Sequence, residues 1–528
     1  MSGFLTRRTA LTSLGGGLAL GGMMSGAARA QGQPDLGQVE SLVAATMAAF
    51  EQPGLGLAIV KDGQPLLAKG YGVRRLGGSA PADQATLFSI ASNSKAYTAA
   101  SLALLVEEGK VGWDEPVVKY LPEFAMHDPY VTASMTVRDL LVHRSGLALG
   151  QGDLMIWPNT THSRAELIHG LRYLKPARGF RSGYAYDNVL YVVAGELASR
   201  VSGMPWEDLV ETRIFAPLGM KDSVASFSRL EGRDNVASAH ARVSGAVRGA
   251  GPLTPIASDD FDNAAPAGGL QMSARDAVRW LQVQLGQGAI PGGGRLWSEA
   301  TGREMWKGQT ITSDGPGATA DNPVRPMFGL YALGWQVEDY RGRTLVWHSG
   351  AVSGQISFTA MLPGQQFGVC AWTNAEEGGV LRTLRNGILD WALGDTSHDW
   401  LTDNKARFGR RVAENAAELP VRPAKPARPA LPLKAYAGVY RDPWYGTITL
   451  AETKGGLTIR FDKSPSMSGS LEPWNGEVFK TRFTDRNIED AFVTFEATAG
   501  KVSRITLKAF SPSADFSYDY HDLEFRPA

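Results

Sequence analysis

Two mostly apolar runs near the start of the chain predict a β-hairpin. They cover residues 54–60 and 64–73 and are separated by Lys61-Asp62-Gly63, whose Asp-Gly pair is typical of a tight hairpin turn. An alanine- and leucine-rich segment from Ser92 to about Glu108 then predicts a helix that ends beside a glycine. This part of the chain therefore combines an antiparallel pair of strands with a helix.

The same mixture continues to about residue 400. A helix is predicted between Thr136 as its N-cap and Gly146 as its stop, and another over residues 192–201. Apolar runs over residues 355–363 and 366–374 predict two strands of one antiparallel sheet, and residues 380–393 predict a closing helix. Helices interleaved with antiparallel strands indicate a domain of the mixed α/β (α+β) class.

The composition changes after this helix. Prolines at every third position from Pro420 to Pro432 fit the three-residue turn of polyproline II and predict a stiff linker. Short strand-like runs separated by turn residues follow from Tyr436 to Phe510, which predicts a small antiparallel barrel or sandwich. We therefore expect three parts: a domain over residues 31–400, a Pro-rich linker over 401–433 and an all-β domain over 434–528.

Length, charge and cysteine content indicate a protein of several domains and argue against nucleic-acid binding and a cysteine-rich metal site. With 528 residues the chain exceeds the size at which one core stops growing, which agrees with several domains. Its 53 basic and 53 acidic residues balance, whereas nucleic-acid-binding proteins usually carry a basic excess. Cys370 is the only cysteine, so the chain has neither an internal disulfide nor a cysteine-rich metal site. We expect no nucleic acid, no metal and no cofactor.

Residues 1–30 have the layout of an export signal. The pair Arg7-Arg8 precedes a weakly hydrophobic, glycine-rich run from Ala10 to Met24, and small residues at 28 and 30 offer a cleavage site. The arginine pair is typical of the twin-arginine route. We expect cleavage, no stable membrane insertion afterwards, and a periplasmic or secreted protein. The alternative is an uncleaved anchor, for which the run is short.

Ser92 and Lys95 are the first candidates for chemistry. If the segment around them is helical, their i, i+3 spacing places both side chains on one face, one turn apart. A serine hydroxyl is a weak nucleophile unless a base takes its proton, and a lysine amine is such a base once its pKa is lowered by burial or by positive neighbours. The pair alone also fits an N-cap serine beside a solvated lysine.

Two later stretches supply candidate partners. In Tyr186-Asp187-Asn188 the outer side chains point the same way if the segment is extended, and a tyrosine can move a proton while an asparagine amide holds a substrate. A core strand followed by an Asn188 helix cap fits equally well. His348-Ser349-Gly350 ends a strand-like run, where an imidazole could bind substrate or move protons and the glycine allows close approach. An edge strand and a turn explain it too.

In combination, Ser-x-x-Lys, Tyr-x-Asn and His-x-Gly form a variant of the serine–lysine motif set of β-lactamases and penicillin-binding proteins. From about residue 54 to residue 393 the chain resembles the class C β-lactamase and penicillin-recognising serine hydrolase superfamily, which includes D-aminopeptidases and related esterases. The resemblance extends to residues 140–147, 215–220, 267–270 and 334–335. It implies a β-lactamase/transpeptidase-like antiparallel sheet flanked by helices.

The C-terminal part is similar to the lipocalin-like domain that accompanies many of these hydrolases. That domain either borders the active-site cleft, mediates oligomers or is a passive appendage.

The resemblance also implies a role for each motif residue. Ser92 would be acylated, Lys95 would accept its proton, and Tyr186 would pass that proton to the leaving group. Asn188, His348 and Gly350 would contact the substrate. The backbone N–H groups of Ser92 and Ala351 would form the oxyanion hole, and no metal would take part.

One residue departs from the usual pattern. The third motif of β-lactamases and transpeptidases usually begins with lysine, whereas His348 is mostly neutral at pH 7. We expect a serine hydrolase that cleaves amide or peptide bonds of small-molecule or peptide substrates, including substrates with D-residues. The alternatives are a carboxylesterase, a weak β-lactamase, or a binding or sensor protein that is acylated with little turnover. Subunit number stays open, with a homo-oligomer among the alternatives.

Overall fold

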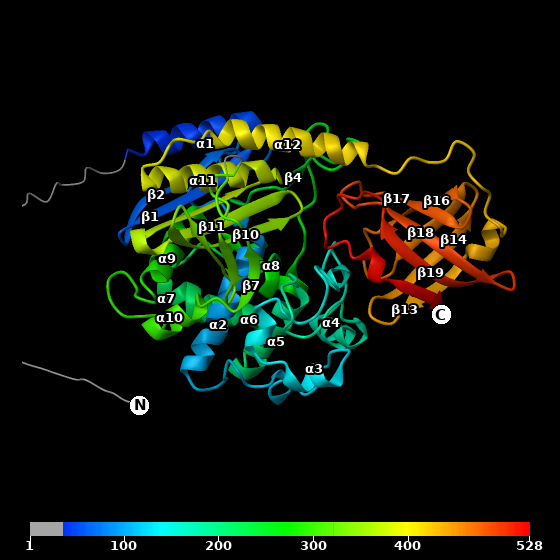
Figure 1. Ribbon diagram of the computed structural model, residues 1–528, viewed down its shortest axis with the longest axis horizontal. Helices are drawn as coiled ribbons and strands as arrows, with labels where there is room; N and C mark the ends of the chain where they lie inside the picture. The colour runs from blue at the N-terminus through cyan, green and yellow to red at the C-terminus, as the bar shows by residue number, and fades with distance from the viewer. Residues whose placement is uncertain (1–34, 320–321) are drawn as a thin grey trace, which may run out of the picture.

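The computed structural model of the protein describes residues 35–319 and 322–528. Two bodies lie side by side: residues 37–417 form a sheet covered by helices, and residues 438–527 form a β-barrel (Figure 1). This confirms the predicted mixed domain followed by a small all-β barrel. The predicted export signal lies outside the described residues. Within the described ranges, no helix is both long and apolar enough to cross a membrane.

The larger domain is built around an eight-stranded antiparallel sheet with the order β2-β1-β12-β11-β10-β9-β8-β7. Its middle strands β1, β11 and β12 are buried along almost their whole length, which explains their continuous apolar sequences. The strands are β1 (Gly54–Lys61), β2 (Gln64–Gly72), β7 (Thr310–Asp314), β8 (Phe328–Tyr331), β9 (Gln336–Tyr340), β10 (Arg343–Val352), β11 (Gln355–Leu362) and β12 (Phe367–Thr373).

The turn between β1 and β2 is the predicted one. Asp62 and Gly63 have φ angles of 51° and 73°, as the two central residues of a tight hairpin turn require.

Helices cover both faces of the sheet (Figure 1). One layer consists of α1 (Gly37–Phe50), α11 (Gly378–Leu393) and α12 (Trp400–Ala417), whose apolar side chains pack with those of β1, β11 and β12. The other layer contains α2 (Lys95–Glu107), α5 (Val189–Ser202), α8 (Ala265–Gly268) and α9 (Ala274–Leu285). Shorter elements complete the domain: α3 (Pro129–Ser134), α4 (Arg164–Gly170), α6 (Trp206–Val210), α7 (Ala216–Leu218), α10 (Glu299–Met305), β3 (Phe88–Ser89), β4 (His240–Ala241), β5 (Thr254–Pro255) and β6 (Gln271–Met272).

Two helix predictions need correction. The helix expected from Ser92 starts at Lys95, because residues 91–94 form a 3-10 turn first. The helix expected between Thr136 and Gly146 is wrong: only Arg138–Leu141 form a 3-10 turn. The buried Asp139 carboxylate accepts hydrogen bonds from the Thr136 backbone N–H at 3.1 Å and from its hydroxyl at 2.7 Å, so the side chain stabilises a turn and not a helix.

The predicted linker is shorter than expected. Its first part forms most of α12, which packs on α1 and α11 with the Phe50 and Phe408 ring centroids 6.1 Å apart. Trp400 is buried between these helices, and its indole N–H donates to Asp390 at 2.7 Å. The proline-rich residues that follow lead to the barrel (Figure 1).

The barrel closes through antiparallel pairing of neighbouring strands in chain order. Large aromatic side chains fill it: the ring centroids of Tyr436 and Phe495 lie 4.8 Å apart, and those of Phe479 and Phe495 lie 5.1 Å apart. The patterns missed two strands, β16 and β20. The strands are β13 (Gly438–Asp442), β14 (Gly446–Thr453), β15 (Gly456–Phe461), β16 (Ser468–Asn475), β17 (Val478–Phe483), β18 (Ala491–Thr498), β19 (Lys501–Ala509) and β20 (Glu524–Pro527).

Candidate active site

Ser92 lies in the 3-10 turn that leads directly into α2. Ala91 has a φ angle of 46°, in the left-handed region that residues with a side chain seldom adopt, so the backbone bends just before the serine. Buried hydrogen bonds hold this bend. The Ser357 hydroxyl donates to the Ile90 carbonyl at 2.6 Å, and the Ile90 N–H donates to the Leu270 carbonyl at 3.0 Å. Strand β11 and the residue before β6 therefore fix where Ser92 emerges.

Lys95 is completely buried beside the serine. Its Nζ lies 3.0 Å from Ser92 Oγ, 2.7 Å from Asn188 Oδ1 and 2.8 Å from the Ala267 carbonyl oxygen. The last two atoms can only accept hydrogen bonds from the amine. When the amine is uncharged, these two acceptors take its two N–H protons, so its lone pair points towards the Ser92 hydroxyl.

The surroundings of Lys95 set its protonation state. Burial lowers the pKa of Lys95 to about 7, although the carboxylates of Asp153 and Asp187 act in the opposite direction. The ring centroids of Tyr186 and Tyr191 lie 4.8 Å and 5.3 Å from Nζ, so little water reaches the amine. At neutral pH a large share of Lys95 is consequently the free amine, which can accept a proton.

Tyr186 and Asn188 precede α5, and both side chains face Lys95. Asn188 makes no side-chain cap to the helix, so of the two interpretations of this stretch the capping one does not apply. Burial raises the pKa of Tyr186 well above 10, and a hydrogen bond with Ser92 lowers it by less. Tyr186 is therefore a neutral phenol with a proton to give.

His348 lies on β10 at the edge of the site, and its ring faces the protein. Its Nε2 is 2.8 Å from the Tyr331 hydroxyl, and its Nδ1 is 2.5 Å from the Ser349 carbonyl oxygen. Burial, with Lys95 adding to the effect, lowers the pKa of His348 to about 3. The imidazole is thus neutral, and its contacts order Tyr331 and the end of β10.

Beyond His348, β10 has an unpaired edge beside Ser92. The strand pairs with β9 only up to Trp347 but with β11 up to Val352, so the backbone between them is open on one side. A Cβ atom added at Gly350 would lie 2.8 Å from the Ser92 nitrogen. Glycine therefore lets the backbone of Gly350 and Ala351 come next to the Ser92 N–H group.

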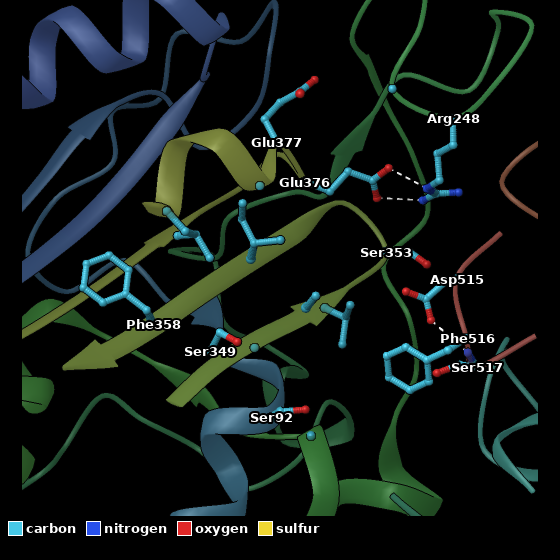
Figure 2. A pocket seen from close by; sticks show the side chains of 18 of the residues that line it. Ser92, Arg248, Ser349, Ser353, Phe358, Glu376, Glu377, Asp515, Phe516 and Ser517 are labelled. Carbon is cyan, nitrogen blue, oxygen red and sulfur yellow. Dashed lines mark hydrogen bonds and ion pairs between the residues drawn. The ribbon is translucent and has the colours of Figure 1, made fainter. Parts of the chain in front are cut away.

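A cavity of about 920 Å³ opens in front of Ser92, and both domains line it (Figure 2). One wall comes from β10, α11 and α12. The opposite wall includes Ser513 and residues 515–518 of the barrel domain. Figure 2 shows Phe516 and Ser517 entering the cavity from the barrel side. Of the interpretations given to the C-terminal domain, the structure supports the one in which it borders the cleft.

Several residues of the site were not selected from the sequence. They are the Ala267 carbonyl, Tyr331, Asp153 and Ser517. Residues 267–270 belong to the family resemblance, but a backbone carbonyl that accepts a hydrogen bond leaves no signal in the residue types. Asp153 and Ser517 carry no local signal, since they join the site through contacts 35 residues (Asn188–Asp153) and 364 residues (Asp153–Ser517) apart in the chain.

Comparisons with protein families cover nearly the whole described chain. The family described as "Beta-lactamase" matches residues 39–390, and "Domain of unknown function (DUF3471)" matches residues 422–527. The boundary between the two matches falls around α12 and the proline-rich residues.

Curated relatives and solved structures agree with these matches. The unguisins hydrolase ungD′ of Aspergillus campestris is 27% identical over 84% of this chain and 83% of its own length. Penicillin-binding protein 4 of Amycolatopsis lactamdurans is 26% identical over 65% of this chain and 85% of its own. The octameric penicillin-binding protein homologue from Pyrococcus abyssi aligns over 93% of this chain and 99% of its own, with 20% identity and a TM-score of 0.58. A class C β-lactamase aligns over 69% and 97%, with 18% identity and a TM-score of 0.55.

Proposed function

Because the chain belongs to the β-lactamase family of serine hydrolases, we propose that it forms an acyl-enzyme at Ser92 and hydrolyses amide or peptide bonds of small substrates, including substrates with D-residues. The observation that carries this proposal is the pair of Ser92 Oγ and Lys95 Nζ, 3.0 Å apart at the end of a large cavity. A hydroxyl needs such a base to attack a carbonyl carbon at neutral pH.

The side chains support a complete proton route. Lys95 takes the proton of Ser92 as Oγ attacks the substrate carbonyl, and the oxyanion is held by the backbone N–H groups of Ser92 and Ala351. Each such donor contributes about 3 kcal/mol to the transition state. When the intermediate collapses, Tyr186 gives its proton to the leaving nitrogen and regains one from Lys95. Water then attacks the acyl-enzyme while the free amine of Lys95 takes a proton from it, and that proton passes to Ser92 Oγ as the acyl–oxygen bond breaks, which restores the starting state.

Two observations favour amides over esters. An amine leaves only when its nitrogen is protonated, and Tyr186 holds a proton beside Ser92 because burial keeps its pKa high. In addition, Arg382, Arg385 and Arg411 line the wall of the cavity formed by α11 and α12. Guanidinium groups bind carboxylates, which peptides carry and simple esters need not. The hydrolase and penicillin-binding protein among the relatives are consistent with this substrate class.

The test compares the purified protein with its Ser92→Ala variant on matched chromogenic substrates: D- and L-alanyl anilides, a short acyl ester and a cephalosporin. We expect steady cleavage of an anilide that the variant lacks, with the D-isomer preferred. Turnover of the ester alone would replace the amidase proposal by a carboxylesterase, and turnover of the cephalosporin alone by a weak β-lactamase. A single burst of product without steady turnover would indicate an acylated sensor.

Activity should depend on pH through the amine. With the pKa of Lys95 lowered to about 7, the amine becomes protonated below that pH and can no longer accept the serine proton. We therefore expect kcat/KM to be constant above roughly pH 8 and to fall about tenfold per unit below roughly pH 6.5. A series from pH 5 to 9 on one substrate measures this. A profile that stays flat down to pH 5 would contradict Lys95 as the base.

A further inference from the structure

Two barrel residues hold a turn of the hydrolase domain that lies under the site. Asp519 accepts hydrogen bonds from the backbone N–H groups of Gly152, at 2.6 Å, and Leu154, at 3.1 Å. Ser517 donates its hydroxyl proton to Oδ2 of Asp153 at 2.8 Å. The 3-10 turn Asp153–Met155 is thus fastened to the C-terminal domain by one side chain on its backbone and another on its carboxylate.

From this turn a chain of hydrogen bonds leads to the catalytic amine. Asn188 donates from Nδ2 to Asp153 Oδ2 at 2.8 Å and accepts from Lys95 Nζ at Oδ1, at 2.7 Å. An amide has two chemically different ends, and a carboxylate can accept but not donate. Asp153 therefore keeps the Nδ2 end of Asn188 on its own side and the Oδ1 end towards Lys95. If the Asn188 amide flipped, its Nδ2 protons would face those of Lys95 Nζ, and its Oδ1 would face the Asp153 carboxylate.

We propose that the C-terminal barrel completes the catalytic centre: Ser517 fixes Asp153, and Asp153 acts as a positioning residue that orients Lys95 through Asn188. This inference rests on the proposed function of the Ser92–Lys95 pair. It assigns the barrel a role in catalysis itself, in addition to its place along the cavity wall.

The burial of Asp153 shows why this contact matters. The carboxyl group is fully buried, and within the part of the chain that the structure describes its Oδ1 has no hydrogen-bond partner. Burial raises the pKa of Asp153 to about 7, while the bonds from Ser517 and Asn188 and the charge of Lys95 act in the opposite direction. Without the Ser517 hydroxyl the carboxyl group is protonated more readily, and its negative charge near Lys95 is lost.

The other titratable groups around this pair are known. Asp515 and Asp519 face Asp153 from the barrel. Asp187 faces Lys95 from the segment before α5. His143 and His348 are neutral because burial lowers their pKa, and the phenols of Tyr186 and Tyr191 are neutral because burial raises theirs. Of the carboxylates, Asp153 is the one that is joined to Lys95 through a side-chain amide and to the barrel through a hydroxyl.

The experiment measures how fast a fluorophosphonate labels Ser92 in the full chain between pH 5 and 9. This probe reacts with an activated serine directly, so the natural substrate does not have to be known. Ser92→Ala is the reference that should not be labelled. We expect Ser517→Ala to lower the labelling rate at high pH, where it is constant, about fivefold, which is the effect of one lost hydrogen bond. We also expect the fall of the rate at acid pH, the acid limb of the profile, to move to lower pH. The sign follows because loss of negative charge at Asp153 lowers the pKa of Lys95.

Asp153→Asn is the second variant. It keeps an oxygen that accepts from Asn188 and Ser517 but removes the charge, so it should move the acid limb down by roughly one pH unit. Ser517→Thr keeps the hydroxyl and should label like the wild type. The matched control is Ser503→Ala, which removes another barrel hydroxyl, one that donates to the Glu496 carbonyl away from the cavity. If the contact between Ser517 and Asp153 only stabilised the fold, the variants would show a smaller fraction of labelled protein, and the acid limb would stay at the same pH.

Each result is decisive. Rates and profiles of Ser517→Ala and Asp153→Asn that match those of the wild type, with the wild type labelled at Ser92, would overturn this inference and leave the proposed function standing. A rate loss in Ser517→Ala with an unmoved limb, or without recovery in Ser517→Thr, would overturn it too. Failure of the wild type to be labelled would overturn both the inference and the proposed function.

Discussion

A Lys95→Met variant is expected to lose about 10⁴-fold in kcat/KM on every substrate that the wild type cleaves. Methionine has a similar length and fills the fully buried position, but it has no lone pair basic enough to take the proton of Ser92. Methionine removes the cost of burying a charged amine but leaves the Asn188 and Ala267 oxygens without their donor, so we expect these opposing effects to leave only a small change in the thermal midpoint. Steady-state kinetics and a thermal melt measure both effects.

The matched control for this prediction is Lys119→Met. Lys119 is an exposed lysine that pairs with Glu115, four residues earlier in the chain, and such exposed pairs contribute little to stability. It should keep its full activity. More than a tenth of wild-type activity in Lys95→Met would mean that another group activates Ser92, and the assignment of the base would have to change.

Gly350→Ala is expected to lower kcat/KM about 10²- to 10³-fold, equivalent to the loss of an oxyanion-hole donor. The added Cβ would lie 2.4 Å from the Ile90 carbonyl oxygen, 2.6 Å from Ser357 Oγ and 2.8 Å from the Ser92 nitrogen. Two of these atoms belong to the backbone, so the strand has to move away from the serine. We also expect a loss of about 1–3 kcal/mol in the free energy of unfolding, as overpacking usually causes.

Gly364→Ala controls for the loss of a glycine as such. Gly364 lies in the turn between β11 and β12, and an added Cβ would meet nothing within 4 Å. Its activity and urea midpoint should match those of the wild type. Kinetics measured on folded Gly350→Ala, well below its urea midpoint, separate the two effects. Activity within threefold of the wild type would contradict a tight approach of β10 to Ser92.

The sheet and most of the barrel could be predicted because their signals are local. The apolar runs of β11 and β12 and the Asp62-Gly63 turn report burial and backbone conformation directly. The error at residues 136–146 has a different origin, since the apolar spacing there resembles a helix. A buried carboxylate, Asp139, pairs with Arg144 and Arg181 and holds the backbone in a turn. Tertiary contacts of this kind override the local pattern.

The candidate site shows the same division. The i, i+3 spacing of Ser92 and Lys95 could be read from the sequence even though a 3-10 turn, and not a full helix, carries the serine. The lowered pKa of Lys95 could not, because it depends on Tyr186 and Tyr191 closing over the amine. The role of Ser517 could not be predicted either, because no rule of composition or spacing links a serine in a C-terminal loop to an aspartate in another domain.

The position of the barrel loop along the chain has a consequence for biosynthesis. Residues 515–519 come after every other part of the site in the sequence, and domains fold in the order in which they leave the ribosome. A growing chain can therefore build the sheet and place Ser92 and Lys95 while Asp153 still lacks its barrel partners. If Ser517 positions Asp153 as we propose, the chain reaches its full activity only after residues 517–519 have left the ribosome and docked on the 3-10 turn Asp153–Met155.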